Sequence, residues 1–127
     1  IRTWLDTDGM GSAGWLAALA DPHLGRALSL IHEKPAHPWS VGDLAKEAGI
    51  SRSGFAARFT DVLGETPMIY LTRWRLDCAR QWLGATGASL GEIAERVGYK
   101  SEAAFSRAFK RHFGMGPGMA RRQDADQ

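Results

Sequence analysis

The chain contains the same two-helix unit twice, and this internal repeat constrains its fold more than any other feature. The first half of the unit recurs at an offset of 49 residues and the second half at an offset of 50, so one residue is inserted in the turn between them. The matched positions are Ser40, Leu44, Ala45, Ala48, Gly49, Phe55, Phe59, Gly64 and Pro67 in the first copy, and Ser89, Ile93, Ala94, Val97, Gly98, Phe105, Phe109, Gly114 and Pro117 in the second. A repeat of this kind predicts two segments that fold alike.

Signals for helix starts and stops recur throughout the chain, whereas signals for strands do not. Ser40 with Asp43, and Ser89 with Glu92, have the spacing of a capping box. We expect helices to begin after Asp21, Ser40, Ser51, Thr66, Ser89 and Ser101, and to end at Pro35, Gly49, Gly64, Gly98 and Gly114. The helix from 66 to 84 is the longest, and its broad apolar arc predicts burial on two sides.

Each repeated unit is a short helix, a glycine-containing turn and a longer helix, which is the helix-turn-helix pattern. In that motif the second helix enters the major groove of DNA. We therefore expect an all-α fold, with helix-turn-helix subdomains at 21–65 and 86–122 and a linker helix at 66–85. Residues 1–20 are expected to be a linker and 123–127 a tail. A plain α-hairpin within a helical bundle is the alternative for each unit.

The net charge of +2 hides a strong segregation of charge along the chain. Residues 52–122 carry twelve basic and six acidic side chains, while 1–25 and 123–127 are each acidic. A basic body favours a polyanionic partner, because clustered cations gain free energy by releasing counterions. An ordinary solvated basic face is the other interpretation.

Composition also limits where the chain can act. No apolar run approaches the roughly 18 residues of a membrane span. Cys78 has no cysteine partner, so a disulfide framework is excluded, a reducing compartment is favoured, and the residue is expected in the core. We expect a cytoplasmic protein. The first residue is Ile1 rather than Met, which suggests a fragment of a longer protein.

The recognition helices are predicted near 51–64 and 101–113, anchored by their phenylalanine pairs. The face opposite Phe105 and Phe109 presents Ala103, Arg107 and Lys110, flanked by Glu102 and Ser106. Arg107 is the strongest candidate for reading a base, since a guanidinium can pair bidentately with guanine. The corresponding face of the first unit presents Ser53, Ala57 and Thr60, flanked by Ala56. Phosphate contacts are expected from Ser51, Arg52, Ser101, Lys110 and Arg111.

Three arginines of the long helix are also expected to have distinct roles. Arg75 lies within the apolar arc, so we expect it to pair with a carboxylate or, alternatively, to contact phosphate. Arg73 and Arg80 lie outside the arc and are expected to face solvent or phosphate.

With these residues set out, the chain resembles the AraC/XylS family of bacterial transcription regulators over about 100 residues. The clearest segment is 93–117, which supplies Ile93, Ala94, Gly98, Tyr99, Ser101, Phe105, Arg107, Phe109, Lys110, Gly114 and Pro117. The segment LAKEAGISRSGFAARF and the linker-helix positions Pro67, Tyr70, Leu71, Arg75, Leu76 and Ala79 add to it. Residues 14–28 resemble family members that carry a cupin-like N-terminal effector domain, which would be missing here.

The resemblance implies a homeodomain-like module of about seven helices in two subdomains, within a bacterial protein associated with the nucleoid. It also implies base contacts from Ser53, Ala56 and Ala57 in the first unit, and from Glu102, Ala103, Ser106 and Arg107 in the second. Three residues depart from the family pattern. Ala57 replaces a common arginine, which puts base reading by the first unit in doubt. Gly116 replaces the usual Ser or Thr before Pro117, which weakens the last cap. Ala120 replaces an aromatic residue, which predicts a loosely packed or frayed final helix.

Two other motifs are set aside. Residues 9–14 have the dinucleotide-binding spacing but no preceding strand, and the histidines at 32 and 37 are too far apart for a zinc-protease motif. We expect no enzyme, no cofactor and no metal. Predicted partners are double-stranded DNA and RNA polymerase, with an effector bound only through the missing domain, a dimer in the full-length protein, and no membrane. The alternatives are a helical protein-interaction domain and a nonspecific architectural DNA-binding domain.

Overall fold

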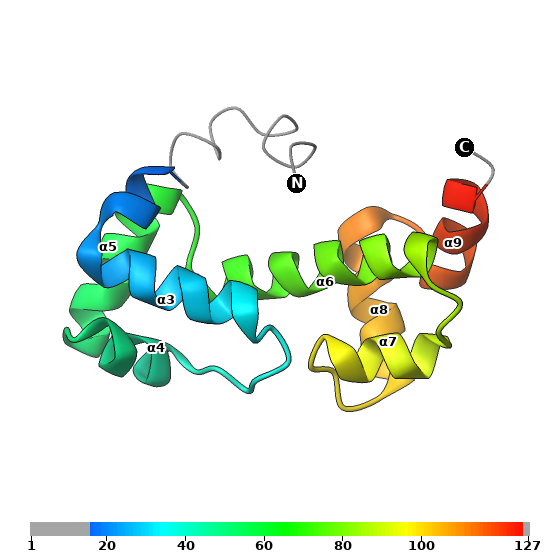
Figure 1. Cartoon of the computed structure of the whole chain (residues 1–127), viewed down its shortest axis with the longest axis horizontal. Helices are drawn as coiled ribbons and strands as arrows, with labels where there is room; N and C mark the ends of the chain where they lie inside the picture. Colours follow the sequence, from blue (N-terminus) through cyan, green and yellow to red (C-terminus); the bar gives the residue numbers. More distant parts are fainter. Residues whose placement is uncertain (1–15, 126–127) are drawn as a thin grey trace. The chain divides into compact units, whose positions relative to one another are not determined.

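The computed structural model describes residues 16–125, which form α-helices and turns with no strand among them (Figure 1). A helical turn at 16–20 precedes α3 (Pro22–Glu33), α4 (Val41–Ala48), α5 (Arg52–Leu63), α6 (Pro67–Ala85), α7 (Leu90–Arg96), α8 (Glu102–Phe113) and α9 (Pro117–Ala125). The predicted all-α fold is confirmed. Within the described part, unit 1 comprises residues 16–33 and 39–70, and unit 2 comprises 34–38 and 71–125.

The helix boundaries follow from the predicted caps. Ser40 and Ser89 each accept from the backbone amide three residues on, and both capping boxes are complete. Ser51 and Ser101 cap α5 and α8 in the same way. The glycines that follow α4, α5, α7 and α8 all have positive φ, which glycine adopts at little cost; they are Gly49, Gly64, Gly98 and Gly114. The glycine-rich motif at 9–14 lies outside the described residues.

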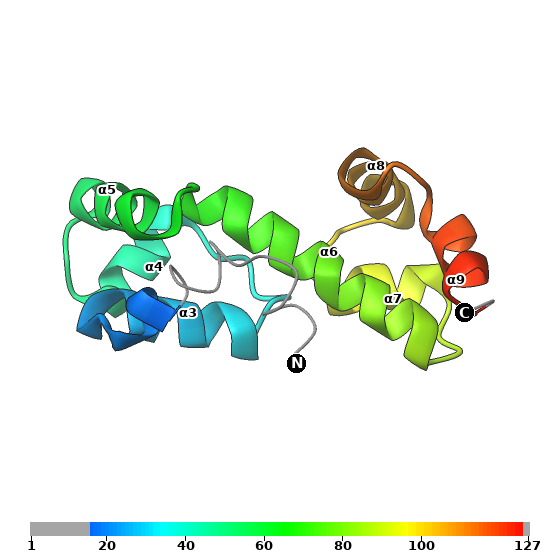
Figure 2. The ribbon, with the colours of Figure 1, turned by 90° about the horizontal axis from the view of Figure 1, so that it is seen from above.

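In unit 1, α3, α4 and α5 pack on one another around a common apolar core, as Figures 1 and 2 show from two directions. The apolar face of α3 is buried, and both phenylalanines of α5 are fully inaccessible to water. The core residues of these helices are Leu24, Ala27, Leu28, Leu30, Ile31, Leu44, Ala45, Ala48, Phe55 and Phe59. Ala18, from the helical turn at 16–20, is also fully buried.

The first turn of α6 is joined to α3 by an aromatic contact. Tyr70 is buried with its ring edge-on to Phe59, and its hydroxyl lies 2.7 Å from Nε2 of His32. Burial lowers the pKa of His32 to about 4, so the imidazole is neutral at pH 7 and acts as a hydrogen-bonding group. The contact fixes the start of α6 on unit 1.

In unit 2, α7, α8 and α9 surround a second core, to which the later part of α6 contributes one face. The buried residues are Leu76, Ala79, Leu83, Ile93, Ala94, Val97, Phe105, Phe109 and Ala120. Cys78 is partly buried against this cluster, and burial raises the pKa of its thiol to about 11, so it behaves as a core residue. The repeated pattern of the sequence therefore yields one core in each unit.

The expectation of a loose final helix is wrong. α9 runs for nine residues, and Ala120 is fully buried where the aromatic residue was expected. Polar anchors outside the core hold α9 in place. Arg121 donates to the carbonyls of Leu83 and Ala88 at 3.0 and 2.6 Å. Asp124 at the other end receives two hydrogen bonds from Arg80.

Gly25 lets the turn at 16–20 lie directly against α3. A Cβ at residue 25 would lie 2.8 Å from the backbone carbonyl oxygen of Leu19, which is too close for any real side chain. Gly84, near the end of α6, is exposed and has open space where its Cβ would be. The two helical glycines therefore offer a matched test of this contact.

We expect Gly25→Ala to destabilise the protein by about 1–3 kcal/mol, because the backbone of the 16–20 turn must move away. Gly84→Ala should instead stabilise it by about 0.5–1 kcal/mol, the gain in helix propensity. Urea unfolding followed by circular dichroism measures both. Equal changes in the free energy of unfolding of the two variants would show that the close approach at Gly25 does not affect stability.

Candidate nucleic-acid interface

The outward face of α8 presents exposed side chains because its opposite face is fixed in the core. Phe105 and Phe109 are fully buried with their rings 5.7 Å apart. The hydroxyl of Ser101 accepts from the amide of Ala104 at 3.1 Å and sets where the helix begins. Of the predicted base-contact residues here, Glu102, Ala103 and Arg107 are exposed and Ser106 is partly exposed. The carboxylate of Glu102 leans toward Gly91 of α7.

α5 is built in the same way but presents a different surface. Ser51 accepts from the amide of Gly54 at 3.1 Å, and the rings of the α5 phenylalanine pair lie 5.6 Å apart. Ser53 and Ala57 are exposed, and Ala56 is partly exposed. These three residues can offer one hydroxyl and two methyl groups, and the exposed Thr60 adds a second hydroxyl, so the capacity of this face for hydrogen bonding to base edges is small.

The predicted phosphate-contact residues all lie at the surface. They are Ser51, Arg52, Ser101, Lys110 and Arg111, and each is exposed. Within residues 16–125, the side chains of Arg52, Arg107 and Lys110 have no ion pair with a carboxylate. These cations therefore keep their full charge available to a polyanion.

The turns that connect the two helices of each unit also repeat in detail. The amides of Gly49 and Ile50 donate to the carbonyls of Lys46 and Ala45, and those of Gly98 and Tyr99 donate to Glu95 and Ala94. Positive φ values of 79° and 96° at the two glycines allow this geometry. The turn thus sets the angle at which each recognition helix leaves its partner.

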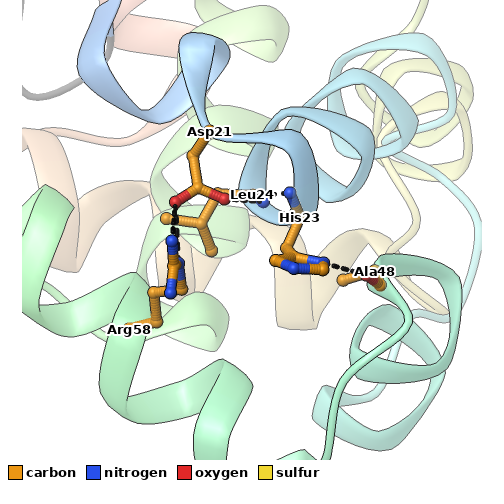
Figure 3. A network of polar contacts seen from close by, with 5 residues as sticks. All are labelled: Asp21, His23, Leu24, Ala48 and Arg58. Carbon is orange, nitrogen blue, oxygen red and sulfur yellow. Dashed lines mark hydrogen bonds and ion pairs between the residues drawn. The ribbon is translucent and has the colours of Figure 1, made fainter.

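Asp21 joins the three helices of unit 1 through a small polar network (Figure 3). Its Oδ1 accepts from the amides of His23 and Leu24 at 2.9 and 3.1 Å, which caps α3. Its Oδ2 accepts from Nε of Arg58 on α5 at 2.7 Å, and Nη2 of the same guanidinium lies 2.7 Å from this oxygen as an ion pair. Burial alone would raise the pKa of Asp21, but the backbone hydrogen bonds and Arg58 together lower it below its usual value.

His23 extends the same network to α4. Its Nδ1 lies 2.8 Å from the carbonyl oxygen of Ala48, the last residue of that helix (Figure 3). The sequence predicted Asp21 as a helix cap. It did not indicate that His23 would contact α4 or that Arg58 would pair with Asp21. A weak signal existed for the cap itself, since Asp21 is followed by Pro22 at the first helical position. The contacts of His23 with Ala48 and of Asp21 with Arg58 join residues 25 and 37 positions apart, so no local sequence pattern indicates them.

The expectations for the α6 arginines need correction. Arg75 pairs with no carboxylate in the described structure; its Nε and Nη2 donate to the carbonyls of Pro35 and His37 at 2.6 and 2.8 Å. Arg80 is not a solvent-facing residue, because it makes two hydrogen bonds to Asp124 and lies over the ring of Phe113 at 4.8 Å.

Arg73 is also engaged. Its Nη1 lies 3.9 Å from a carboxylate oxygen of Asp77, one helical turn along α6. Arg73, Arg75 and Arg80 are each partly exposed and engaged in contacts within the protein, so they support the fold as well as carrying positive charge.

No group of three or more histidine, cysteine or acidic side chains among residues 16–125 could hold a metal ion. His32, part of the motif set aside above, is hydrogen-bonded to Tyr70. No helix within the described range is both long and apolar enough to cross a membrane.

Comparison with known proteins agrees with this geometry. A family profile described as "Helix-turn-helix domain" matches residues 44–123. A solved transcriptional regulator of Chromobacterium violaceum, described as an AraC-type DNA-binding domain protein, is 35% identical, with a TM-score of 0.76 over 82% of this chain and 93% of its own. The chain belongs to the AraC-type helix-turn-helix family. This family consists of transcription regulators and is not a family of enzymes.

Two further proteins are similar to this AraC-type chain. A Streptomyces antibioticus protein described as an AraC-like transcription regulator is 50% identical over 118 residues, which are 93% of this chain and 39% of the relative. The chain thus spans about two-fifths of the length of such curated relatives. The DNA-binding domain of AdpA, solved with a target DNA, is 28% identical, with a TM-score of 0.75 over 81% of this chain and 92% of that domain.

Two substitutions can separate the two contributions of Asp21 to the stability of this AraC-type chain, its cap of α3 and its charge pair with Arg58. Asp21→Asn keeps the cap of α3 but loses the charge pair with Arg58, so we expect a loss of less than about 1 kcal/mol. Asp21→Ala loses both, and we expect about 1–2 kcal/mol. The free energy of unfolding from urea titrations at pH 7 measures each. Similar losses in both variants would assign the main effect to the Arg58 pair rather than to the cap.

Proposed function

We propose that this chain is a sequence-specific DNA-binding domain of a transcription regulator, in which α5 and α8 act as the recognition helices. The proposal assigns one helix-turn-helix subdomain to residues 21–65 and the other to 86–122, with 66–85 as the linker helix. Family membership, the internal repeat and the basic stretch at 52–122 support it. The AdpA domain, which has a similar fold, was solved with DNA.

The exposed face of α8 is the observation that carries the proposal. Two fully buried phenylalanines on one side direct Arg107 and Lys110 to the other side, where they have no ion pair within residues 16–125. A helix with this arrangement can enter a major groove and place a guanidinium beside the O6 and N7 of a guanine. Glu102 can accept from a cytosine amino group, and Ala103 and Ser106 complete the reading surface.

The two recognition helices read DNA unequally in this proposal. α5 offers Ser53, Ala56 and Ala57, which can contact thymine methyl groups and sense groove shape but read few hydrogen-bonding patterns. α8 offers Arg107 as well, so it supplies the stronger base reading.

Phosphate contacts position both helices on the duplex. The helix N-termini capped by Ser51 and Ser101 point backbone amides outward, and each serine hydroxyl still has a proton to donate. Arg52, Lys110 and Arg111 add positive charge near these ends. Such contacts give affinity that depends on salt and carries no sequence information.

Several wider roles stay predictions for the regulator as a whole. These are contact with RNA polymerase, response to a small-molecule effector through an N-terminal domain, formation of a dimer, and location in the bacterial cytoplasm at the nucleoid. In this proposal the domain binds DNA without performing chemistry of its own.

Selection of bound duplexes from a random library, with this chain at moderate salt, tests the proposal. We expect two short enriched motifs, one for each unit, with the stronger one read by α8. A single motif would mean that α5 has little reading role. A folded protein that enriches no motif would contradict the proposal; a steep salt dependence would then indicate an architectural binder, and weak, salt-insensitive binding a protein-interaction domain.

Arg107→Ala and Lys110→Ala form a matched pair, since each removes one positive charge from α8. Loss of Arg107 should cost about 1–3 kcal/mol and relax specificity at one base position. Loss of Lys110 should weaken binding to all duplexes similarly and reduce the salt slope by about one. Titrations of the selected duplex and its single-base variants at several salt concentrations measure both effects. Equal weakening on every sequence for Arg107→Ala would assign it to phosphate instead.

A further inference from the structure

The connection between α3 and α4, residues 34–38, packs with unit 2 although it lies between two helices of unit 1. The side chain of Arg75 in α6 binds the backbone of this connection. The guanidinium donates from Nε to the carbonyl of Pro35 at 2.6 Å and from Nη2 to the carbonyl of His37 at 2.8 Å. Residue 36, between these two carbonyls, is thereby held in a defined place.

The turn of the second helix-turn-helix lies against this held segment. A Cβ at Gly98 would come within 3.1 Å of Cα and O of Ala36 and of Cζ of Arg75. The equivalent glycine of the first unit, Gly49, has a similar positive φ, but no atom lies within 4 Å of the place where its Cβ would be. A side chain at residue 98 would therefore crowd these atoms as well as strain the backbone, whereas a side chain at residue 49 would only strain the backbone.

The contact continues from the turn into α8. Tyr99 follows Gly98 and is partly buried; burial raises the pKa of its phenol, while the nearby charges of Arg75 and Arg111 act to lower it. The ring of Tyr99 packs on Phe105 with centroids 5.7 Å apart. Arg75 lies beside Gly98, and the next residue, Tyr99, packs on Phe105, so these contacts lead from α6 to the buried face of α8.

We propose that Arg75 and the backbone of residues 35–37 form a seat for the turn of the second helix-turn-helix, which makes Arg75 a positioning residue for base reading by α8. The inference deepens the proposed function and rests on it. Arg75 itself contacts no base in this proposal; it acts through Gly98 and Tyr99.

The planar fork of the guanidinium is essential to the seat. Arginine presents donors in a fixed geometry that can satisfy two carbonyls at once, whereas lysine is a point charge on a flexible stem. A base-reading contact from Arg107 requires α8 to be held within about 0.5 Å and roughly 10–20° of the productive geometry. Replacement of the fork by an ammonium group keeps the charge but releases the segment, so α8 loses its fixed angle.

The decisive variant is Arg75→Lys, tested in the whole chain by selection of bound duplexes. We expect at least a threefold loss of enrichment at the base positions that Arg107→Ala also affects. The motif read by α5 and the salt slope of binding should stay as in the unsubstituted protein, because unit 1 keeps its core and the charge is conserved. Unchanged enrichment at every position, or an equal loss at every position, would overturn the proposal.

Gly98→Ala and Gly49→Ala supply the matched control. Both introduce a side chain at positive φ, but only the first also meets the seat. We expect Gly98→Ala to affect the same base positions as Arg75→Lys, and Gly49→Ala to leave those positions unchanged. Circular dichroism and thermal unfolding check that each variant is folded. If Gly98→Ala does not fold, Arg75→Lys alone decides the outcome.

Hydrogen exchange tests the seat independently of DNA binding. The amide of Tyr99, bonded to the carbonyl of Ala94 at 2.9 Å, should exchange at least threefold faster in Arg75→Lys, whether or not DNA is bound. Faster exchange without any motif in the unsubstituted protein would mean that the seat exists and the proposed function fails. Unchanged exchange with an intact motif would overturn the seat and leave the proposed function standing.

Discussion

Burial of two phenylalanines one helical turn apart is the interaction on which each recognition helix depends. Phe55 and Phe59 in α5, and Phe105 and Phe109 in α8, are all fully inaccessible to water. Each buried phenylalanine contributes about 1.5–3 kcal/mol, so a pair fixes the rotation of its helix about its own axis. Once that rotation is fixed, the outward side chains follow from helical geometry alone. The reading surface is thus a consequence of the core.

Arginine hydrogen bonds to backbone carbonyls form the second layer of organisation. Arg75 holds the connection before α4, and Arg121 holds the connection before α7 through the carbonyls of Leu83 and Ala88. In each case the guanidinium satisfies buried or half-buried carbonyls that helix ends and turns leave without partners. These contacts tie irregular segments to the helical cores.

The helices, their caps and the two cores could be predicted from the sequence because their signals are local. Ser40, Ser89 and the four turn glycines act on residues three to five positions away, and the phenylalanine pairs mark the buried face by their spacing. The partners of Arg75 could not be predicted in this way. A backbone carbonyl is present at every residue, so the sequence does not distinguish an acceptor at Pro35 from any other.

The packing of Ala120 failed as a prediction for a related reason. A small residue in place of an aromatic one indicates a gap only if the surrounding elements stay where they are in relatives. Here α9 is anchored by Arg121 and by the Arg80–Asp124 pair, and Ala120 is fully buried.

The residues that bind DNA cannot be predicted from the fold alone. The fold determines which side chains are exposed, but which of them touch a base depends on the DNA partner.

Duplication explains why the two units share a scaffold and yet differ at the surface. Mutations at buried and capping positions are costly in both copies, so Phe55 and Phe105 match, whereas exposed positions are free to differ. Gly49 and Gly98 illustrate a further divergence: the same backbone conformation serves an open turn in one unit and a crowded one in the other. The crowding arises because residues 34–38 pack with unit 2. In the proposed seat, the second recognition helix is positioned by a segment that precedes the first, so the same repeated turn is positioned differently in the two units.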